Sequence, residues 1–439
     1  MQIKQLFVKN LYNLYSYDIN FSEKKDNICI LTGVNGYGKT TILKIIDSLS
    51  KNDLFYFYTF PFEELRIVFT NSDILEISQN YPSMNEDTDF VANFPETVDF
   101  TYKTSDEKVI SHFVLSMRDI YKSISSPARR FLDFSFVDDN SLTYIKDFIS
   151  GHMEIYEKLA LQQNQGQFLS LLKDIKTVFV PAQRLYYTEE EEEASFQYRN
   201  RMGYKKTLSS IDKMITEFKE ELQKRRLDYL LESQKHDNQF IHKLVSSTTE
   251  GYDEKTYNQK ADTLQTRLDE LYSFNLIDKI STLPYDKNKK NILSVYIDDL
   301  SEKLDSYNDL ISKLRIFSEI ITRKDFSNKK ISFSPEQGLI IIASDGNEIN
   351  ANALSSGEQN ELIMLYRFIF GISNGSILLI DEPEISLHVS WQLDFLNDIE
   401  EILREKNMQV IIATHSPQII NEHWDNCFDF YENNDGQRR

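Results

Sequence analysis

The stretch that decides the fold is Gly33-Val34-Asn35-Gly36-Tyr37-Gly38-Lys39-Thr40, which fits the phosphate-loop pattern G-x-x-x-x-G-K-[ST]. An apolar run over residues 27–32 predicts a strand that leads into the loop, and residues 41–49 have the spacing of an amphipathic helix that leaves it. A strand, a glycine-rich turn and a helix N-terminus together present backbone N–H groups to a triphosphate. This context favours a nucleotide site over the alternative, a glycine-rich structural turn.

Each residue type in the loop has a predicted task. Lys39 is expected to reach the β- and γ-phosphates, and the Thr40 hydroxyl is expected to bind Mg²⁺. The residues predicted to contact the nucleotide are Asn35, Gly36, Gly38, Lys39, Thr40 and Thr41.

Three stretches in the C-terminal part of the chain complete the pattern. Residues 377–380 and 410–413 are short apolar runs, which suit parallel strands buried on both faces. In open α/β sheets, ligands lie at the carboxyl ends of such strands, where polar residues follow here. The stretches are Leu354-Ser355-Ser356-Gly357-Glu358-Gln359 at the start of a helix, Ser376-Ile377-Leu378-Leu379-Ile380-Asp381-Glu382-Pro383-Glu384, and Gln409-Val410-Ile411-Ile412-Ala413-Thr414-His415-Ser416.

The polar residues after these two strands are candidates for metal binding and catalysis. Asp381 is predicted to hold Mg²⁺, and Glu382 to act as the general base on the attacking water. His415 is predicted to contact the γ-phosphate, so Lys39, Glu382 and His415 form the candidate catalytic set. The alternatives are a solvated Asp-Glu turn and a structural histidine.

In this order, the four motifs resemble those of the ABC-type ATPase head. The resemblance covers residues 1–50 and 335–425. It implies an α/β fold: a P-loop NTPase head with a mixed central sheet, an antiparallel β-subdomain and an inserted short helical, coiled-coil-like arm. Ser355-Ser356-Gly357-Glu358 stands where transporter subunits have Ser-Gly-Gly-Gln, a variant that resembles the SMC, RecF and OLD-like branch. The long interval between Lys39 and Ser355 also disfavours a transporter, and few residues follow His415, so we expect no OLD-type nuclease domain.

The resemblance further implies ATP and Mg²⁺ as cofactors and a second copy of the chain as a partner. In such heads, the signature residues Ser355 and Gly357 face the γ-phosphate that another protomer holds. ATP is then sandwiched between heads of a homodimer or a higher homo-oligomer. Gln183, after an expected strand over residues 177–181, would reach Mg²⁺ and the attacking water, with a plain polar turn as the alternative.

Residues 380–392 resemble the PARIS-type ATPases of prokaryotic anti-phage defence, with Septu-type ATPases as second choice. That resemblance implies control of a separately encoded effector, a nuclease of TOPRIM or HNH type. An alternative function is an SMC- or RecF-like ATPase that repairs or clamps DNA. A third is a scaffold in which ATP fixes the assembly and turnover is incidental.

Composition limits the partners and the compartment. The 439 residues include 49 basic and 69 acidic side chains, a net charge of −20, which argues against a broad grip on DNA. Nucleic acid is therefore possible but not strongly indicated. The sequence contains no run of 18 apolar residues, so no membrane-spanning helix is predicted. Two cysteines and a start that lacks the features of a signal peptide predict a reducing cytoplasm.

The pattern along the chain predicts three parts: an ATPase lobe over residues 1–203, a helical insertion over 204–328 and a second lobe over 329–439. Short β-rich runs predict an antiparallel meander, and residues 115–176 read as helical with breaks at Pro127 and Gly151. The meander runs are residues 55–58, 65–69, 74–77, 98–102 and 109–114.

The insertion is predicted to be an arm of two antiparallel helices, each of about 25–40 residues, or roughly 40–60 Å long. Apolar residues of the first helix fall at Leu227, Leu230 and Leu231, and the 4-3 spacing of a second set from Leu300 to Ile321 predicts a coiled-coil-like seam. The polar segment Ser233–Glu254 is predicted to form the loop near the tip.

Overall fold

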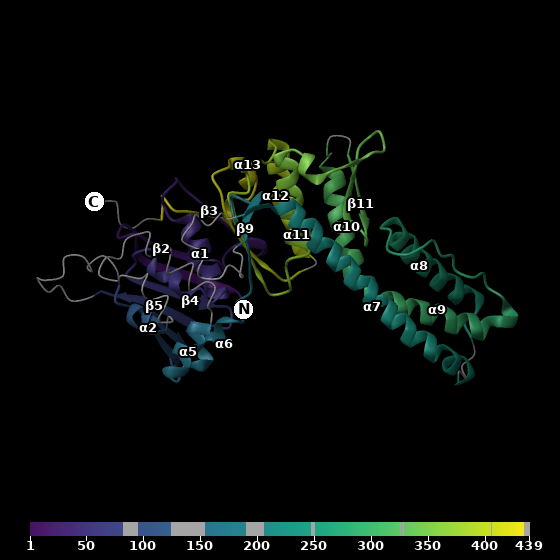
Figure 1. Ribbon diagram of the computed structural model, residues 1–439, viewed down its shortest axis with the longest axis horizontal. Helices are drawn as coiled ribbons and strands as arrows, with labels where there is room; N and C mark the ends of the chain where they lie inside the picture. The colour runs from purple at the N-terminus through teal and green to yellow at the C-terminus, as the bar shows by residue number, and fades with distance from the viewer. Residues whose placement is uncertain are drawn as a thin grey trace, which may run out of the picture. The chain divides into compact units, whose positions relative to one another are not determined.

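A computed structural model of the chain describes residues 1–81, 95–123, 154–189, 206–246, 251–324, 326, 329–404 and 406–433. The chain forms two compact units (Figure 1), the first of Met1–Ala182 with Gly371–Arg439 and the second of Gln183–Phe370. The predicted breaks at Pro127 and Gly151 lie outside the described residues.

A parallel sheet forms the centre of the first unit. Its strand order is β16-β3-β15-β14-β8, and every neighbouring pair is parallel. All residues of β3, β14 and β15 are buried, as their unbroken apolar sequences predict. The strands are β3 (Ile28–Thr32), β8 (Thr177–Val180), β14 (Ile377–Asp381), β15 (Gln409–Ala413) and β16 (Cys427–Asp429).

Register places the carboxyl ends of three strands level with one another. Ala413 of β15 pairs with Leu31 of β3 on one side and with Asp381 of β14 on the other. The chain therefore leaves all three strands at the same edge of the sheet. Helix α1 (Lys39–Ser50) begins there after β3, and it packs against β8, β14 and β15.

An antiparallel sheet shares the hydrophobic core of this unit. Its order β2-β1-β4-β5-β6-β7 confirms the meander over four of the five predicted runs. This sheet is the antiparallel β-subdomain that the resemblance implied, whereas the central sheet is wholly parallel and not mixed. The strands are β1 (Ile3–Leu11), β2 (Tyr15–Asn20), β4 (Glu64–Phe69), β5 (Ile74–Asn80), β6 (Thr97–Lys103) and β7 (Val109–Ser116).

The strand predicted over residues 55–58 is wrong. Leu54–Tyr58 forms a 3₁₀ helix, η2, and all five of its side chains are buried. A strand with one exposed face would have alternated in burial, but these aromatic side chains pack all round in the core, where Phe57 and Phe100 meet edge to face at 5.4 Å.

Helices complete the first unit. On the antiparallel side, α6 and α2 pack against β7, and α5 packs against α6. In the C-terminal part of this unit, α12 follows β14 and packs against α13. The helices are α2 (Met117–Ser123), α5 (Glu154–Gln162), α6 (Gly166–Leu172), α12 (Val389–Arg404) and α13 (Pro417–Ile420).

The second unit consists of long helices and two small sheets. Strand β9 pairs with β10, and β11, β12 and β13 form an antiparallel three-stranded sheet. Its elements are β9 (Tyr186–Glu189), β10 (Lys206–Ser209), α7 (Ser210–Ser246), α8 (Glu254–Ser273), α9 (Lys290–Leu304), η4 (Asp305–Tyr307), α10 (Asn308–Arg323), β11 (Lys330–Ser334), β12 (Gly338–Ile342), β13 (Glu348–Ile349) and α11 (Ser356–Ile369).

Two expectations for the arm are corrected. The predicted tip loop Ser233–Glu254 is wrong, because α7 continues as a helix to Ser246. The second long helix is divided into α9, η4 and α10, although its heptad-like residues Leu304, Tyr307 and Leu314 are buried as expected. The polar composition suggests a loop, but the outer half of α7, from Leu227 to Ser246, is held in a helix by ion pairs to α9. The helical period of a single segment does not reveal such a contact.

The division into units also differs from the predicted boundaries at residues 203/204 and 328/329. The compact units meet at 182/183 and 370/371. The reason is that α11, which begins in the signature motif, packs against α7 and α10 of the insertion.

An aromatic cluster around Phe218 forms part of the core of the second unit. Phe218 is fully buried, and its ring lies 5.0–6.3 Å from four others. We expect Phe218→Ala to lower the free energy of unfolding by about 3–5 kcal/mol, measured by urea denaturation. The exposed Tyr272→Ala is the control, and an equally small loss in both variants would contradict this packing.

Among the residues that the structure describes, no helix combines the length and apolar character needed to cross a bilayer.

Candidate nucleotide site

The phosphate-binding loop curls between β3 and α1 because its glycines adopt left-handed backbone conformations. Gly38, directly before α1, has φ 91°, and a Cβ there would lie 2.8 Å from Leu11 Cδ2. Gly36 has φ 89°, and a Cβ there would meet nothing within 4 Å, so the loop is open on that side. Asn35 and Gly36 are exposed, as expected of residues that surround a ligand with backbone N–H groups.

Lys39 lies folded into this loop with its side chain buried. Its ammonium donates to the Gly33 carbonyl at 2.8 Å and to His415 Nε2 at 2.6 Å. Burial lowers the pKa of Lys39, against the raising effect of nearby carboxylates such as Glu382. The ammonium is therefore held beside backbone dipoles and a ring nitrogen, with no carboxylate hydrogen-bonded to it among the described residues.

His415 accepts this hydrogen bond, because a lysine ammonium has donors only. Burial and the adjacent Lys39 charge lower the pKa of His415, which favours the neutral ring. The ring proton then lies on Nδ1, and Nε2 faces Lys39.

Thr40 and Asp381 form the predicted metal pair. The Thr40 hydroxyl donates to Asp381 Oδ1 at 3.0 Å and lies 3.1 Å from Oδ2. A hydroxyl and a carboxylate in contact provide the oxygen ligands that Mg²⁺ prefers, and few protein ligands suffice because Mg²⁺ keeps several waters. The residues present therefore fit a magnesium ion at this position.

Glu382 follows Asp381 in a strained conformation that turns the chain out of the sheet. Its φ is 44°, its backbone N–H donates to the Ala413 carbonyl at 2.8 Å, and its Oε1 lies 3.3 Å from His415 Nε2. Burial and the neighbouring Glu384 carboxyl raise the pKa of Glu382 to about 8, against the lowering effect of Lys39. A carboxylate with a raised pKa is a stronger base than an exposed one.

Glu384 has a place in the site that the sequence reasoning missed. It accepts a hydrogen bond from the Thr414 hydroxyl at 2.8 Å and another from the His415 backbone N–H at 2.8 Å. It thereby ties the turn after β14 to the turn after β15 and positions His415. The sequence signal was the second acidic residue two positions after Glu382.

Thr41 is placed differently from the other loop residues. Its side chain is buried, and its hydroxyl lies 2.8 Å from the Tyr12 hydroxyl. The contact ties the start of α1 to the turn after β1, so the Thr41 side chain has a structural partner within the protein.

Three predicted site residues belong to the second unit, and their roles remain predictions. Gln183 is exposed and follows β8 by three residues. Ser355 is the N-cap of α11, where its hydroxyl donates to Glu358 Oε2 at 2.8 Å and its Oγ accepts from the Glu358 N–H at 3.3 Å. Gly357 lies in the first turn of that helix, so its backbone N–H is at the positive end of the helix dipole.

The chain matches the family model described as "AAA ATPase domain" over residues 1–420. It is 24% identical over 440 residues to the "Retron Vc95 probable ATPase" of Vibrio cholerae serotype O1 biovar El Tor, covering 93% of this chain and 70% of the relative. It is 23% identical over 447 residues to the "Retron Ec83 probable ATPase" of Escherichia coli, covering 95% and 69%. Among solved structures, it is similar to an SMC head bound to the C-terminal winged-helix domain of ScpA (TM-score 0.35, 12% identity, 96% and 91% covered).

Proposed function

The chain belongs to the AAA ATPase domain family and is an ATPase, and we propose that it uses ATP with Mg²⁺ to close head-to-tail dimers that control a separately encoded effector in anti-phage defence. The observation that supports the catalytic part is the convergence of Lys39, Asp381, Glu382 and His415 at one edge of the parallel sheet. Similarity to two retron ATPases supports a role in defence.

In this proposal, Lys39 exchanges its internal partners for the β- and γ-phosphates. Its present acceptors, the Gly33 carbonyl and neutral His415, are weaker partners than a phosphate oxygen. Thr40 and Asp381 would hold Mg²⁺, which when bound would neutralise charge on the phosphates. When Lys39 turns to the phosphates, the neutral His415 ring can carry its proton on Nε2 instead of Nδ1, and this N–H would donate to a γ-phosphate oxygen and report its presence.

Glu382 is the general base of the proposed reaction. Glu384 is occupied by Thr414 and the His415 backbone, so of the two neighbouring glutamates it is Glu382 that faces Lys39 and His415. The base takes a proton from the attacking water as the bond to the γ-phosphorus forms, and ADP leaves with the bridging oxygen.

Glu384→Gln tests the positioning of His415. The amide oxygen can still accept both hydrogen bonds but without charge assistance, so we expect kcat for ATP hydrolysis to fall about tenfold with little change in KM. Phosphate release is the measurement, and the exposed Glu432→Gln is the matched control. Unchanged kcat in Glu384→Gln would mean that Glu384 does not position the histidine.

The dimer is proposed from the signature motif. The N-terminus of α11 combines a helix dipole with Ser355 and Gly357 and lies in a different unit from the phosphate-binding loop. A second copy would supply this helix end to the γ-phosphate, so that ATP closes the dimer and hydrolysis opens it.

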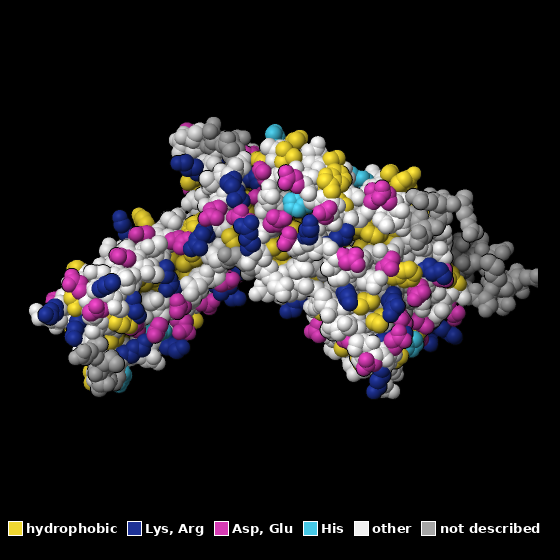
Figure 2. Space-filling model, turned by 180° about the vertical axis from the view of Figure 1, so that it is seen from behind, with side chains coloured by type: hydrophobic (Ala, Val, Ile, Leu, Met, Phe, Trp, Pro, Cys, Tyr) yellow, Lys and Arg dark blue, Asp and Glu magenta, His cyan; other side chains and the backbone are white. Residues whose placement is uncertain are grey.

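Direct DNA clamping is less well supported than effector control. The face drawn in Figure 2 has Lys and Arg side chains interspersed with Asp and Glu and shows no continuous basic stripe. With a net charge of −20, sequence-independent DNA binding would depend on a small local patch.

The effector is tested by co-purification. Tagged Glu382→Gln chain is expressed with its neighbouring genes and purified with ATP, and the mass and composition of the eluted complex are determined. A stoichiometric nuclease of TOPRIM or HNH type would support the proposal and the PARIS-type resemblance of residues 380–392, which remains a prediction. A bare homodimer with salt-dependent DNA affinity would favour the clamp.

A further inference from the structure

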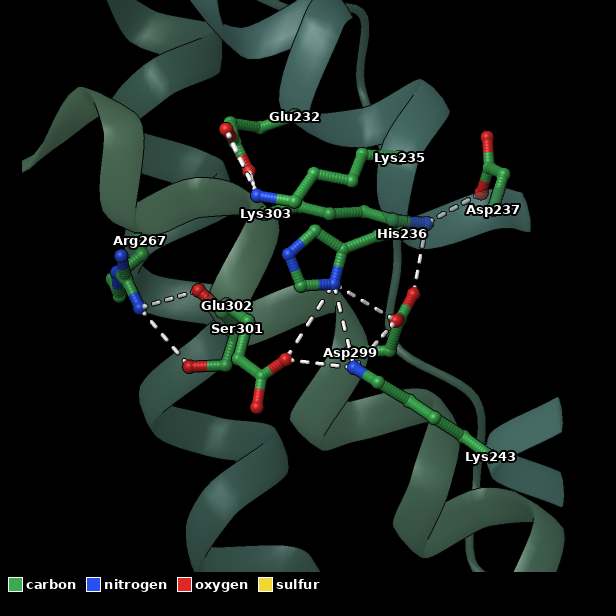
Figure 3. A network of polar contacts seen from close by, with 10 residues as sticks. All are labelled: Glu232, Lys235, His236, Asp237, Lys243, Arg267, Asp299, Ser301, Glu302 and Lys303. Carbon is green, nitrogen blue, oxygen red and sulfur yellow. Dashed lines mark hydrogen bonds and ion pairs between the residues drawn. The ribbon is translucent and has the colours of Figure 1, made fainter. Parts of the chain in front are cut away.

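The outer half of α7 turns its polar face toward the rest of the arm. His236 Nδ1 lies 3.2 Å from Asp299 Oδ1 of α9, and Lys243 Nζ lies 2.8 Å from Glu302 Oε2 (Figure 3). His236, Asp299 and Glu302 have the residue types of a metal site, but the Lys243 ammonium already lies within 3.4 Å of an atom of each. The cluster is therefore an internal ion-pair network that joins α7 to α9.

The opposite face of the same segment is apolar and exposed. Leu227, Leu231, Ile241 and Val245 are 56%, 57%, 70% and 83% exposed. A helix of a globular protein normally turns its apolar stripe to the core and its charges to water, and here the arrangement is reversed. Leu230, which flanks this face, is 53% exposed.

The exposed residues follow a heptad. We call this set the outer stripe, and its successive spacings of 4, 3, 4, 3 and 4 residues fit alternating d and a positions of a coiled coil. Its two central positions are exposed amides, and its four outer positions are apolar. The outer stripe is Leu227, Leu231, Gln234, Asn238, Ile241 and Val245.

The outer stripe is symmetric about His236. If a second α7 lies antiparallel with the two-fold axis at this residue, Leu227 meets Val245, Leu231 meets Ile241, and Gln234 meets Asn238 of the second copy. Apolar residues then pair with apolar residues, and the amides pair with each other, so each buried polar group has a partner. Such self-complementarity is the requirement for a two-fold interface between identical chains.

The flanking positions fit the same register. Asp228 would lie beside His242 of the second copy, and Leu230 beside Leu244. A parallel pairing would instead place Leu230 beside a lysine, Lys235.

The like charges nearest the axis are already paired within their own chain. Lys235 is 3.2 Å from Glu232, and Asp237 is 2.6 Å from Lys303 (Figure 3). Their repulsion across the axis is therefore reduced.

We propose that the outer stripe is an interface with a second copy of this chain, formed as a two-fold antiparallel coiled coil of α7 helices centred on His236. The pairing uses no nucleotide and no residue of the ATP site, so it is independent of the proposed head dimer. Together, an arm contact and a head contact would let ATP change the state of an assembly that already exists.

Sedimentation velocity of the full chain without nucleotide tests the interface. We expect wild type to sediment as a dimer of the 51.6-kDa chain. We expect the Leu231→Glu, Ile241→Glu double variant to dissociate with a Kd at least ten times higher and with unchanged circular dichroism. Ile292→Glu, 53% exposed on α9, is the matched control.

Two outcomes would overturn the proposal. One is a monomeric wild-type chain at micromolar concentration, and the other is a double variant that dimerises like wild type. If the double variant loses a co-expressed effector but the chain alone is monomeric, the stripe binds the effector and not a second copy. ATP-induced dimerisation that survives in the double variant would leave the head proposal intact while the arm proposal is judged separately.

Disulfide trapping tests the antiparallel register. Leu227→Cys chain and Val245→Cys chain, differently tagged, are oxidised alone and as a mixture, with wild type as the background for Cys29 and Cys427. The proposal predicts a cross-link only in the mixture, because 18 residues separate the two positions along α7, about 27 Å at 1.5 Å per residue. Cross-links within each single variant, or none in the mixture, would contradict it.

Discussion

Glu382→Gln is expected to abolish most ATP turnover while ATP binding is retained. Glutamine has the size of glutamate but cannot take a proton from the attacking water, and general-base catalysis contributes about 10²–10⁴-fold to a rate. Because the partly buried Glu382 has its pKa raised to about 8 by burial and by Glu384, its carboxylate is matched to proton transfer near neutral pH. We therefore expect kcat to fall by about two to four orders of magnitude.

The measurement is steady-state phosphate release, with calorimetry for ATP affinity and the exposed Glu422→Gln as the matched control. Loss of both binding and turnover would mean that the substitution disturbs the loop. Normal turnover would mean that another group is the base, and Glu384 would then be the first residue to test.

Lys39→Ala is expected to lose ATP binding. Lys39 is buried, and its ammonium donates to the Gly33 carbonyl of the loop. Among the residues that the structure describes, no other lysine donates to this loop. Charge-assisted hydrogen bonds contribute about 1.5–3 kcal/mol each, so the loss of contacts to two phosphates should weaken affinity roughly a hundredfold or more.

Calorimetry with ATP and Mg²⁺ measures this change, and Lys44→Ala, an exposed lysine on the same helix, is the matched control. Retained affinity in Lys39→Ala would refute the assignment of the phosphate-binding loop. If circular dichroism shows that Lys39→Ala is unfolded, Lys39→Met is measured instead, because methionine keeps a long buried side chain and removes the charge.

The parts of the fold that the sequence predicts well are those whose patterns need no distant partner. The unbroken apolar runs of β3, β14 and β15 identify buried parallel strands, and the polar residues that follow them identify the site. Because the register aligns the ends of these strands, Lys39 lies beside His415 and Thr40 lies beside Asp381.

The parts that were missed depend on contacts between segments far apart in sequence. Glu384 is a positioning residue only because the turn after β15 lies beside it. The outer half of α7 has the composition of a loop, but its polar face contacts Asp299 and Glu302 of α9, and its leucines lie on the exposed side. No period in a single segment shows which face another helix covers.

The central claim, that one chain completes the ATP site of another, is tested most directly by mixing two inactive variants. Ser355→Arg has an intact phosphate-binding loop but a blocked signature helix. Lys39→Ala has an intact signature helix but a phosphate-binding loop that lacks its lysine. A mixed head-to-tail dimer rebuilds one complete site, so we predict that the mixture hydrolyses ATP although neither protein does so alone. If the mixture stays inactive while both variants remain folded and Ser355→Arg still binds ATP, the signature helix does not act on the nucleotide of a second chain.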